Sequence, residues 1–180
     1  QTKESSDGTI SSEKPEENFL AGFSMGGYGA FKFAMQRPEM FAACGNFSGP
    51  INIIPRTPVA PDEKRGQPCL RDDFCEEPFA TLWASFGSAA KRRNTPDDNM
   101  YMLEKHLREG TDLPKFYMAI GSEDPGAQDA YACMDEMCRM GLDFTQVRDA
   151  GKHDWVYCNR HVERFLNWIP LHSDYIMEDQ

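Results

Sequence analysis

A chain of 180 residues, 40% of them hydrophobic, can bury one core, and no apolar run in it approaches the roughly twenty residues that span a bilayer. The formal net charge of −10 disfavours nucleic acid and anionic membranes as partners, because both would repel the chain. Small or neutral ligands remain open.

The first predicted elements frame a short glycine-rich motif. Residues 1–17 are rich in Ser, Glu and Lys and predict a flexible lead-in. The next residues predict a strand over Phe19–Phe23 and a helix over Gly26–Gln36. Between them, residues 22–26 read Gly-Phe-Ser-Met-Gly, the pattern of a nucleophile elbow. Such an elbow holds its serine in a strained turn and needs neighbours without bulk two positions before and after it. The pattern predicts Ser24 as a nucleophile.

The same turn predicts a site for a negatively charged oxygen. The backbone N–H of Met25 and the N-terminus of the following helix would both point at a developing oxyanion. We therefore expect Met25 to supply one oxyanion-hole donor. A serine that merely fills a tight turn is the alternative, which the order of strand, motif and helix disfavours.

The middle of the chain is irregular. Phe41–Phe47 predicts a strand, which Ser-Gly-Pro at residues 48–50 would end. Residues 51–99 contain half of the chain's twelve prolines and predict a lid-like insertion beside an active site. Aromatic side chains could line a substrate pocket, although aromatic residues belong to a core about as often. These candidate pocket residues are Phe23, Trp83, Phe86 and Trp155.

Regular elements return after this insertion. Thr95, followed by a proline and two acids, predicts the N-cap of a helix that runs to about Arg108. The remaining predicted elements are a strand over Lys115–Ile120, a helix over Ala127–Met140, a strand over Phe144–Val147 and a helix over Asn159–Trp168.

A nucleophile elbow predicts an acid and then a histidine, each in a loop after a later strand. The strand that ends at Ile120 leads into Gly-Ser-Glu-Asp-Pro, so Asp124 is the candidate acid. Glu123 and Asp129 remain alternatives, in which case Asp124 would cap the next helix.

The candidate base is His153, because it lies in a loop, residues 151–155, after the last predicted strand. The other three histidines lack this setting, and we expect them to be solvated or packed: His106, His161 and His172.

Three segments together resemble the esterase D-like branch of the α/β-hydrolases, which includes tributyrin, acetylxylan and feruloyl esterases and S-formylglutathione hydrolases. They are AGFSMGGYGA at residues 21–30, GSED at 121–124 and GKHDW at 151–155, and the likeness extends from about Phe19 to Trp168. The resemblance implies the C-terminal part of an α/β-hydrolase fold, a mostly parallel sheet flanked by helices. It also implies a triad of Ser24, Asp124 and His153.

The resemblance implies a serine carboxylic ester hydrolase that forms an acyl-enzyme. Its substrates would be small-molecule or carbohydrate esters, with short acyl, acetyl or feruloyl groups and with plant polysaccharides among the candidate alcohols. The alternatives are an acyltransferase on the same fold and a non-catalytic fragment or binding module.

The family's upstream half is not visible in this sequence. The polar residues before Phe19 have no room for the strands that precede the elbow strand in an α/β-hydrolase. That half would carry the loop that contributes the second oxyanion N–H. We therefore expect an N-terminal segment or a second chain to lie against Phe19–Phe23 and to supply this donor.

The expected organisation is a lead-in over residues 1–17 and one α/β-hydrolase domain over 18–180, with the insertion at about 51–99. No cofactor and no metal are expected, because the acidic pairs lack the spacing of a calcium loop and the six cysteines form no C-x-x-C. A cytoplasmic protein with reduced thiols is favoured, with secretion as the alternative.

Overall fold

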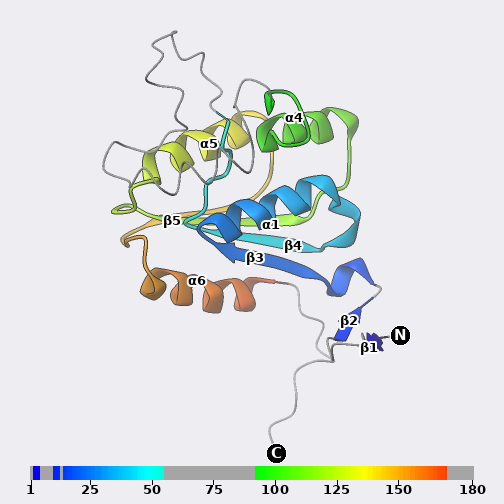
Figure 1. Cartoon of the computed structure of the whole chain (residues 1–180), viewed down its shortest axis with the longest axis horizontal. Helices are drawn as coiled ribbons and strands as arrows, with labels where there is room; N and C mark the ends of the chain where they lie inside the picture. The colour runs from blue at the N-terminus through cyan, green and yellow to red at the C-terminus, as the bar shows by residue number, and fades with distance from the viewer. Residues whose placement is uncertain (1, 5–9, 13, 55–91, 170–180) are drawn as a thin grey trace, which may run out of the picture.

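The computed structural model describes residues 2–4, 10–12, 14–54 and 92–169 (Figure 1). Its main sheet has four parallel strands in the order β3-β4-β5-β6. Their bounds are Phe19–Phe23 for β3, Ala43–Phe47 for β4, Lys115–Gly121 for β5 and Thr145–Asp149 for β6. Because all four strands run the same way, their carboxyl ends meet at one edge of the sheet, where ligands bind in folds of this kind.

Helices cover both faces of this sheet. One face carries α1 (Met25–Gln36), α4 (Asn99–Glu109) and α5 (Ala127–Arg139), and the opposite face carries α6 (Trp155–Trp168) (Figure 1). The predicted parallel sheet with flanking helices is thus confirmed. Shorter elements complete the described chain: β1 (Thr2–Glu4) and β2 (Ile10–Ser12), which pair antiparallel, and the 3-10 turns η1 (Pro15–Glu17) and η2 (Pro38–Met40).

The core has two parts, one on each face of the sheet. Phe31 of α1, Leu103 of α4 and Phe116 of β5 belong to the larger cluster. Phe47 and Tyr117 pack with Phe165 of α6 in the smaller one. All five residues of β4 are buried, since both faces of this strand are covered. The carboxyl edge of the sheet is therefore held by packing from both sides.

Two helices begin at other residues than the sequence predicts. The N-cap of α4 is Asp98, whose carboxylate accepts a hydrogen bond from Tyr101 N at 3.2 Å, whereas Thr95 is bonded within the preceding turn. The N-cap of α6 is Asp154, which accepts from Tyr157 N at 2.8 Å, so this helix begins four residues before the predicted Asn159. In both cases an aspartate satisfies the free N–H groups of the first turn.

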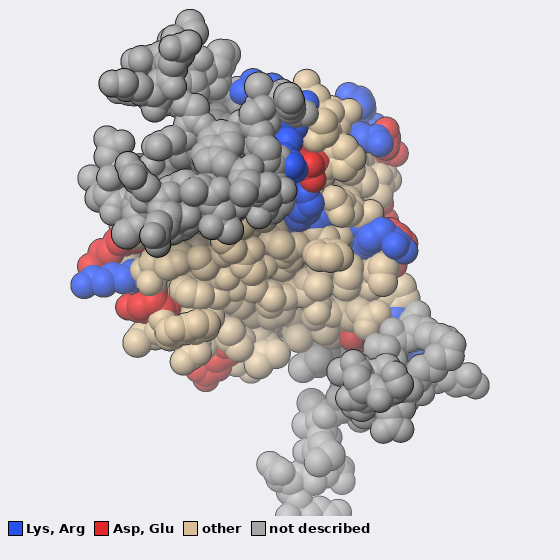
Figure 2. Space-filling view, in the orientation of Figure 1, with Lys and Arg blue, Asp and Glu red and all other residues tan. Residues whose placement is uncertain are grey.

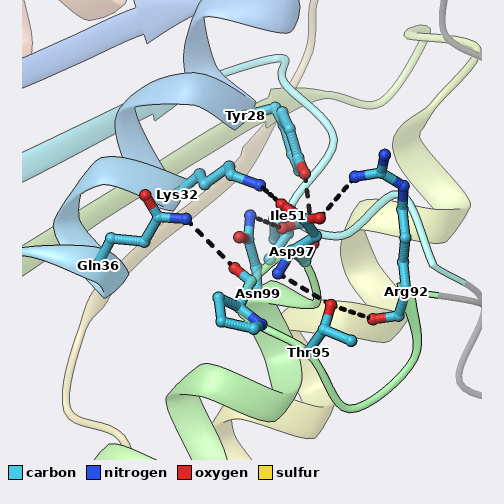
Figure 3. A network of polar contacts seen from close by, with 9 residues as sticks. Tyr28, Lys32, Gln36, Ile51, Arg92, Thr95, Asp97 and Asn99 are labelled. Atoms are coloured by element: carbon cyan, nitrogen blue, oxygen red, sulfur yellow. Dashed lines mark hydrogen bonds and ion pairs between the residues drawn. The ribbon is translucent and has the colours of Figure 1, made fainter. Parts of the chain in front are cut away.

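A polar network ties the start of α4 to α1 (Figure 3). Asp97 binds Lys32 of α1 and accepts from Arg92 Nη1 at 2.6 Å, while its backbone oxygen accepts from Tyr28 Oη at 3.4 Å. The amide of Asn99 donates to the backbone oxygen of Ile51 at 3.0 Å. The bond between Asn99 and Ile51 joins the two ends of the segment predicted as a lid-like insertion. Residues 55–91 of that segment lie outside the described residues.

β3 is an edge strand within the described part of the chain. Its residues are only partly buried and Ala21 is exposed, in contrast to β4. The molecular face around β3 carries few charged side chains (Figure 2). In the same described residues, no helix is long and apolar enough to cross a membrane.

Candidate active site

The turn between β3 and α1 holds Ser24 in a strained backbone conformation. Its φ of 56° and ψ of −127° are unusual for any residue except glycine, and such strain is typical of functional sites. A Cβ on Gly22 would lie 2.1 Å from the backbone oxygen of Gly26, so no side chain fits there. At Gly26, however, a Cβ would meet no described atom within 4 Å. The expected need for two small neighbours therefore holds before the serine and not after it.

A second close approach replaces the one expected at Gly26. A Cβ on Gly27 would lie 2.3 Å from Oδ1 of Asn46, a buried side chain of β4. The same Asn46 oxygen accepts from Gly49 N at 2.9 Å. The start of α1 thus rests directly on β4, which sets the height of Ser24 above the sheet.

The three side chains predicted as a triad lie together at the carboxyl edge of the sheet. His153 Nε2 is 2.9 Å from Ser24 Oγ, and His153 Nδ1 is 2.8 Å from Asp124 Oδ2. A carboxylate only accepts hydrogen bonds, so Nδ1 carries the proton of the neutral ring and Nε2 faces the hydroxyl as an acceptor. In this tautomer His153 can accept the proton of Ser24.

Asp124 is the acid that the structure brings to the histidine. Its carboxylate is nearly buried, and Oδ1 accepts from Gly126 N at 2.8 Å. Burial raises the pKa of Asp124, but the hydrogen bonds from His153 and Gly126 outweigh it and lower the pKa overall. Glu123 is instead exposed and lies 3.8 Å from Lys152, and Asp129 belongs to the first turn of α5.

The loop that carries His153 is fixed by α6, which the sequence does not signal. Tyr157 Oη donates to Asp149 Oδ1 at 2.9 Å, and Arg160 donates to the backbone oxygen of Ala150 at 2.7 Å. A Cβ on Gly151 would lie 2.1 Å from the ring of Tyr157, so the loop passes directly against that ring. These contacts define the path of the backbone two residues before His153.

Two of the candidate pocket residues lie beside the histidine. The ring of Phe23 is 4.8 Å from that of His153 and 5.2 Å from that of Trp155, whose side chain is largely exposed. Met25 begins α1, so its N–H is among those that a helix leaves without an internal partner. Trp83 and Phe86 fall outside the described residues.

The other histidines differ from His153 in their surroundings. His106 is bonded to the backbone oxygen of Met35 at 2.7 Å and to Thr111 at 3.1 Å, and His161 is buried beside Tyr117. Both are packed, as predicted, and His172 lies outside the described residues. No group of three or more potential metal ligands is found among the residues that the structure describes.

Comparison with known proteins places this geometry in a family. The model of the family described as "Putative esterase" matches residues 7–170. The chain belongs to this esterase family. It is 25% identical to an acetyl esterase of Caldicellulosiruptor saccharolyticus over 162 residues, which cover 90% of the chain and 58% of that relative.

Solved structures agree with this assignment. The substrate-bound fluorophosphonate-binding serine hydrolase FphF of Staphylococcus aureus matches with a TM-score of 0.67 and 27% identity, over 88% of the chain and 56% of FphF. The S-formylglutathione hydrolase FrmB of the same organism matches with a TM-score of 0.62 and 26% identity, over 88% and 53%. The fold is thus part of an α/β-hydrolase fold, and the chain spans little more than half the length of these relatives.

Proposed function

We propose that the protein to which this chain belongs is a serine carboxylic ester hydrolase. The observation that carries the proposal is the chain of hydrogen bonds from Ser24 through His153 to Asp124, which starts at a strained turn between β3 and α1. Membership of the esterase family supports the same activity.

The reaction proceeds in two halves. Ser24 Oγ bonds to the carbonyl carbon of the ester while His153 Nε2 takes the hydroxyl proton, and Asp124 stabilises the resulting imidazolium. The tetrahedral intermediate then collapses, and the alcohol leaves with the proton from His153. Water, deprotonated by the same histidine, attacks the acyl-enzyme, and the acid leaves as the bond to Ser24 Oγ breaks and His153 returns the proton to that oxygen. Met25 N–H binds the negative oxygen in both intermediates.

One donor is less than this reaction needs. Loss of a single oxyanion-hole donor lowers turnover by about 100- to 1000-fold. We therefore propose that a segment of the full-length protein, or a second copy, lies along β3 and supplies the second donor. The edge of β3, which pairs with no other strand among the described residues, and the greater length of the relatives both support this proposal.

Short acyl and aromatic acyl esters are the proposed substrates. An acetyl esterase and an S-formylglutathione hydrolase are among the relatives, and both names describe small acyl groups. The exposed ring of Trp155 next to Phe23 offers an apolar surface beside the nucleophile. Acyl transfer to an alcohol would use the same acyl-enzyme and is distinguished by its product.

The test uses the full-length enzyme with Ser24→Ala and, as a control, Ser122→Ala, which removes an exposed hydroxyl near the acid. We expect native and control proteins to hydrolyse p-nitrophenyl acetate and to be labelled by a fluorophosphonate, and Ser24→Ala to do neither. An Ser24→Ala variant with activity within tenfold of native would refute the proposal. A series of acetyl, butyryl and feruloyl esters, with and without an acceptor alcohol, then defines the substrate class.

A further inference from the structure

Ser48 directly follows β4 and lies between the nucleophile and the acid. The backbone oxygen of Phe47 accepts from Ser24 N at 3.0 Å, and Ser48 N donates to the backbone oxygen of Ala119 at 2.7 Å. The end of β4 is therefore bonded both to the nucleophile and to the strand that leads to Asp124.

The backbone of Ser48 is strained. Its φ is 51°, in the left-handed region that glycine and asparagine adopt most easily. A turn alone would be better served by one of those residues. The presence of a serine in this conformation points to a role for its hydroxyl rather than for the backbone.

The Ser48 hydroxyl is also buried and lacks an ordinary partner. The residue is 3% exposed, and its Oγ forms no well-oriented hydrogen bond with any described residue. Buried hydroxyls almost always have a partner, so each exception calls for an explanation. Since a hydroxyl hydrogen rotates freely, a small change in a neighbour can complete such a bond.

The charged group next to this position in the fold is Asp124, because Ser48 N is bonded to Ala119 of β5 and β5 leads into the turn that carries Asp124. Burial raises the pKa of this carboxyl, and the Ser48 hydroxyl is one of the groups that lower it again, together with His153 and Gly126. Asp124 Oδ2 binds His153 and Oδ1 accepts from Gly126 N, and each oxygen has a second lone pair. The carboxylate can therefore accept a third donor.

We propose that Ser48 is a positioning residue, whose hydroxyl donates to the Asp124 carboxylate when substrate is bound and so fixes the carboxylate that orients His153. The inference rests on the proposed function, because it assigns to Ser48 a role within the same triad. In this role Ser48 acts through Asp124 and is not itself a catalytic residue.

The experiment compares Ser48→Ala and Ser48→Gly in the full-length enzyme. Both remove the hydroxyl, but glycine also relieves the strain at a φ of 51°. We expect both variants to lose about tenfold in kcat, the loss expected for one hydrogen bond to a charged group, with little change in KM. Ser122→Ala, an exposed serine in the turn before Asp124, is the matched control and should keep the native kcat.

The pH profile supplies a readout that a purely structural role would not move. The Ser48 hydroxyl would partly neutralise the negative charge of the Asp124 carboxylate. Without this donor, the carboxylate stabilises the imidazolium of His153 more strongly. The acid limb of the pH profile of kcat, which reports the enzyme–substrate complex, should therefore move to higher pH in both variants. The nearby Lys152 and Glu123 pair is more than half exposed and unchanged by the substitutions, so its effect is common to all proteins compared.

The inference is overturned if Ser48→Gly keeps the native kcat and acid limb, since the hydroxyl is then dispensable. It is also overturned if Ser48→Gly fails to fold, since the side chain is then needed for stability. These outcomes are separable from a failure of the proposed function. That failure would appear as activity in Ser24→Ala, whatever the behaviour of the Ser48 variants.

Discussion

Gly22 and Gly26 flank Ser24 at equal distances along the chain, but they stand in different surroundings. A Cβ at Gly22 would overlap the backbone of Gly26 and Gly27, which cannot yield without moving the elbow. A Cβ at Gly26 meets open space among the described residues. The motif treats the two glycines alike, but in the folded turn only Gly22 has no room for a side chain.

We predict opposite results for alanine at these two positions. Gly22→Ala should slow fluorophosphonate labelling of Ser24 by about a hundredfold or more, because a displacement of about an ångström is enough to misplace a nucleophile. Gly26→Ala should leave the free energy of unfolding unchanged or raise it by up to about 1 kcal/mol, as measured by urea denaturation. Equally slow labelling of Ser24 in the two variants would contradict the geometry.

The acid provides a second test on single residues. Asp124→Asn should lower kcat roughly a thousandfold or more, since an amide cannot hold the ring in the tautomer that leaves Nε2 free. Glu123→Gln should change kcat by less than about fivefold, because Glu123 is exposed and its contact with Lys152 is long. Steady-state kinetics on an acetyl ester measures both. A mild effect at Asp124 would return the assignment to Glu123 or Asp129.

The elements around the site are held by interactions distant in sequence. The contact of Asp97 with Lys32 and Arg92 connects the start of α4 to the helix that follows the nucleophile (Figure 3). The contacts of Tyr157 and Arg160 connect α6 to the loop that carries His153. The first contact supports the helix that follows Ser24, and the contacts of α6 support the loop of His153.

The Asp97 network predicts a pH dependence of stability. The hydrogen bond from Lys32, with the charge of Arg92, lowers the pKa of Asp97 below its ordinary value of 3.8. The unfolded chain therefore binds a proton at Asp97 at a higher pH than the folded protein does. The stability that Asp97 contributes is complete above pH 3.8 and is lost as the pH falls through the lowered pKa.

Asp97→Asn should accordingly be less stable than native at pH 7, by about 1 kcal/mol or less for each partly exposed ion pair that it loses. The difference should shrink as the pH falls below 3.8. Urea denaturation at stepped pH measures it, with the exposed Asp112→Asn as control. A difference that grows toward low pH would reverse the assigned sign.

At the scale of the whole molecule, the described sheet stops at β3. The edge of β3 that no described strand covers adjoins a surface with few charges (Figure 2). On α6, the hydrophobic side chains of Trp155 and Leu166 are also exposed. An uncovered apolar edge of this kind is prone to pair with other chains. The proposed covering segment would pair with this edge.

We predict that the full-length protein protects all the backbone amides of Phe19–Phe23 from hydrogen exchange. In a strand paired on one side only, the amides that point away from β4 would exchange within the time of loop amides. Exchange measured residue by residue in the active protein decides between these patterns. Fast exchange of alternate amides in an active monomer would exclude a covering strand.

The elbow and its serine could be predicted from the sequence. Gly22, Ser24 and the apolar run before them predict a strand, a turn and a helix because each depends on near neighbours, and the loops around Asp124 and His153 follow from strand ends in the same way. The helix starts at Asp98 and Asp154 were misplaced, since several polar residues nearby could serve as caps and only tertiary packing selects one.

The order of residues along the chain does not give the distances between the triad side chains. The tertiary structure decided these distances. The 2.9 Å between His153 and Ser24 spans 129 residues and depends on the order of four strands and on the contacts that α6 makes with the loop. Ser48 gave no signal, because its importance arises from burial and a positive φ that appear only when β4 lies between β3 and β5. The sequence determined which residues can carry the chemistry, and the packing of distant segments decided which of them meet.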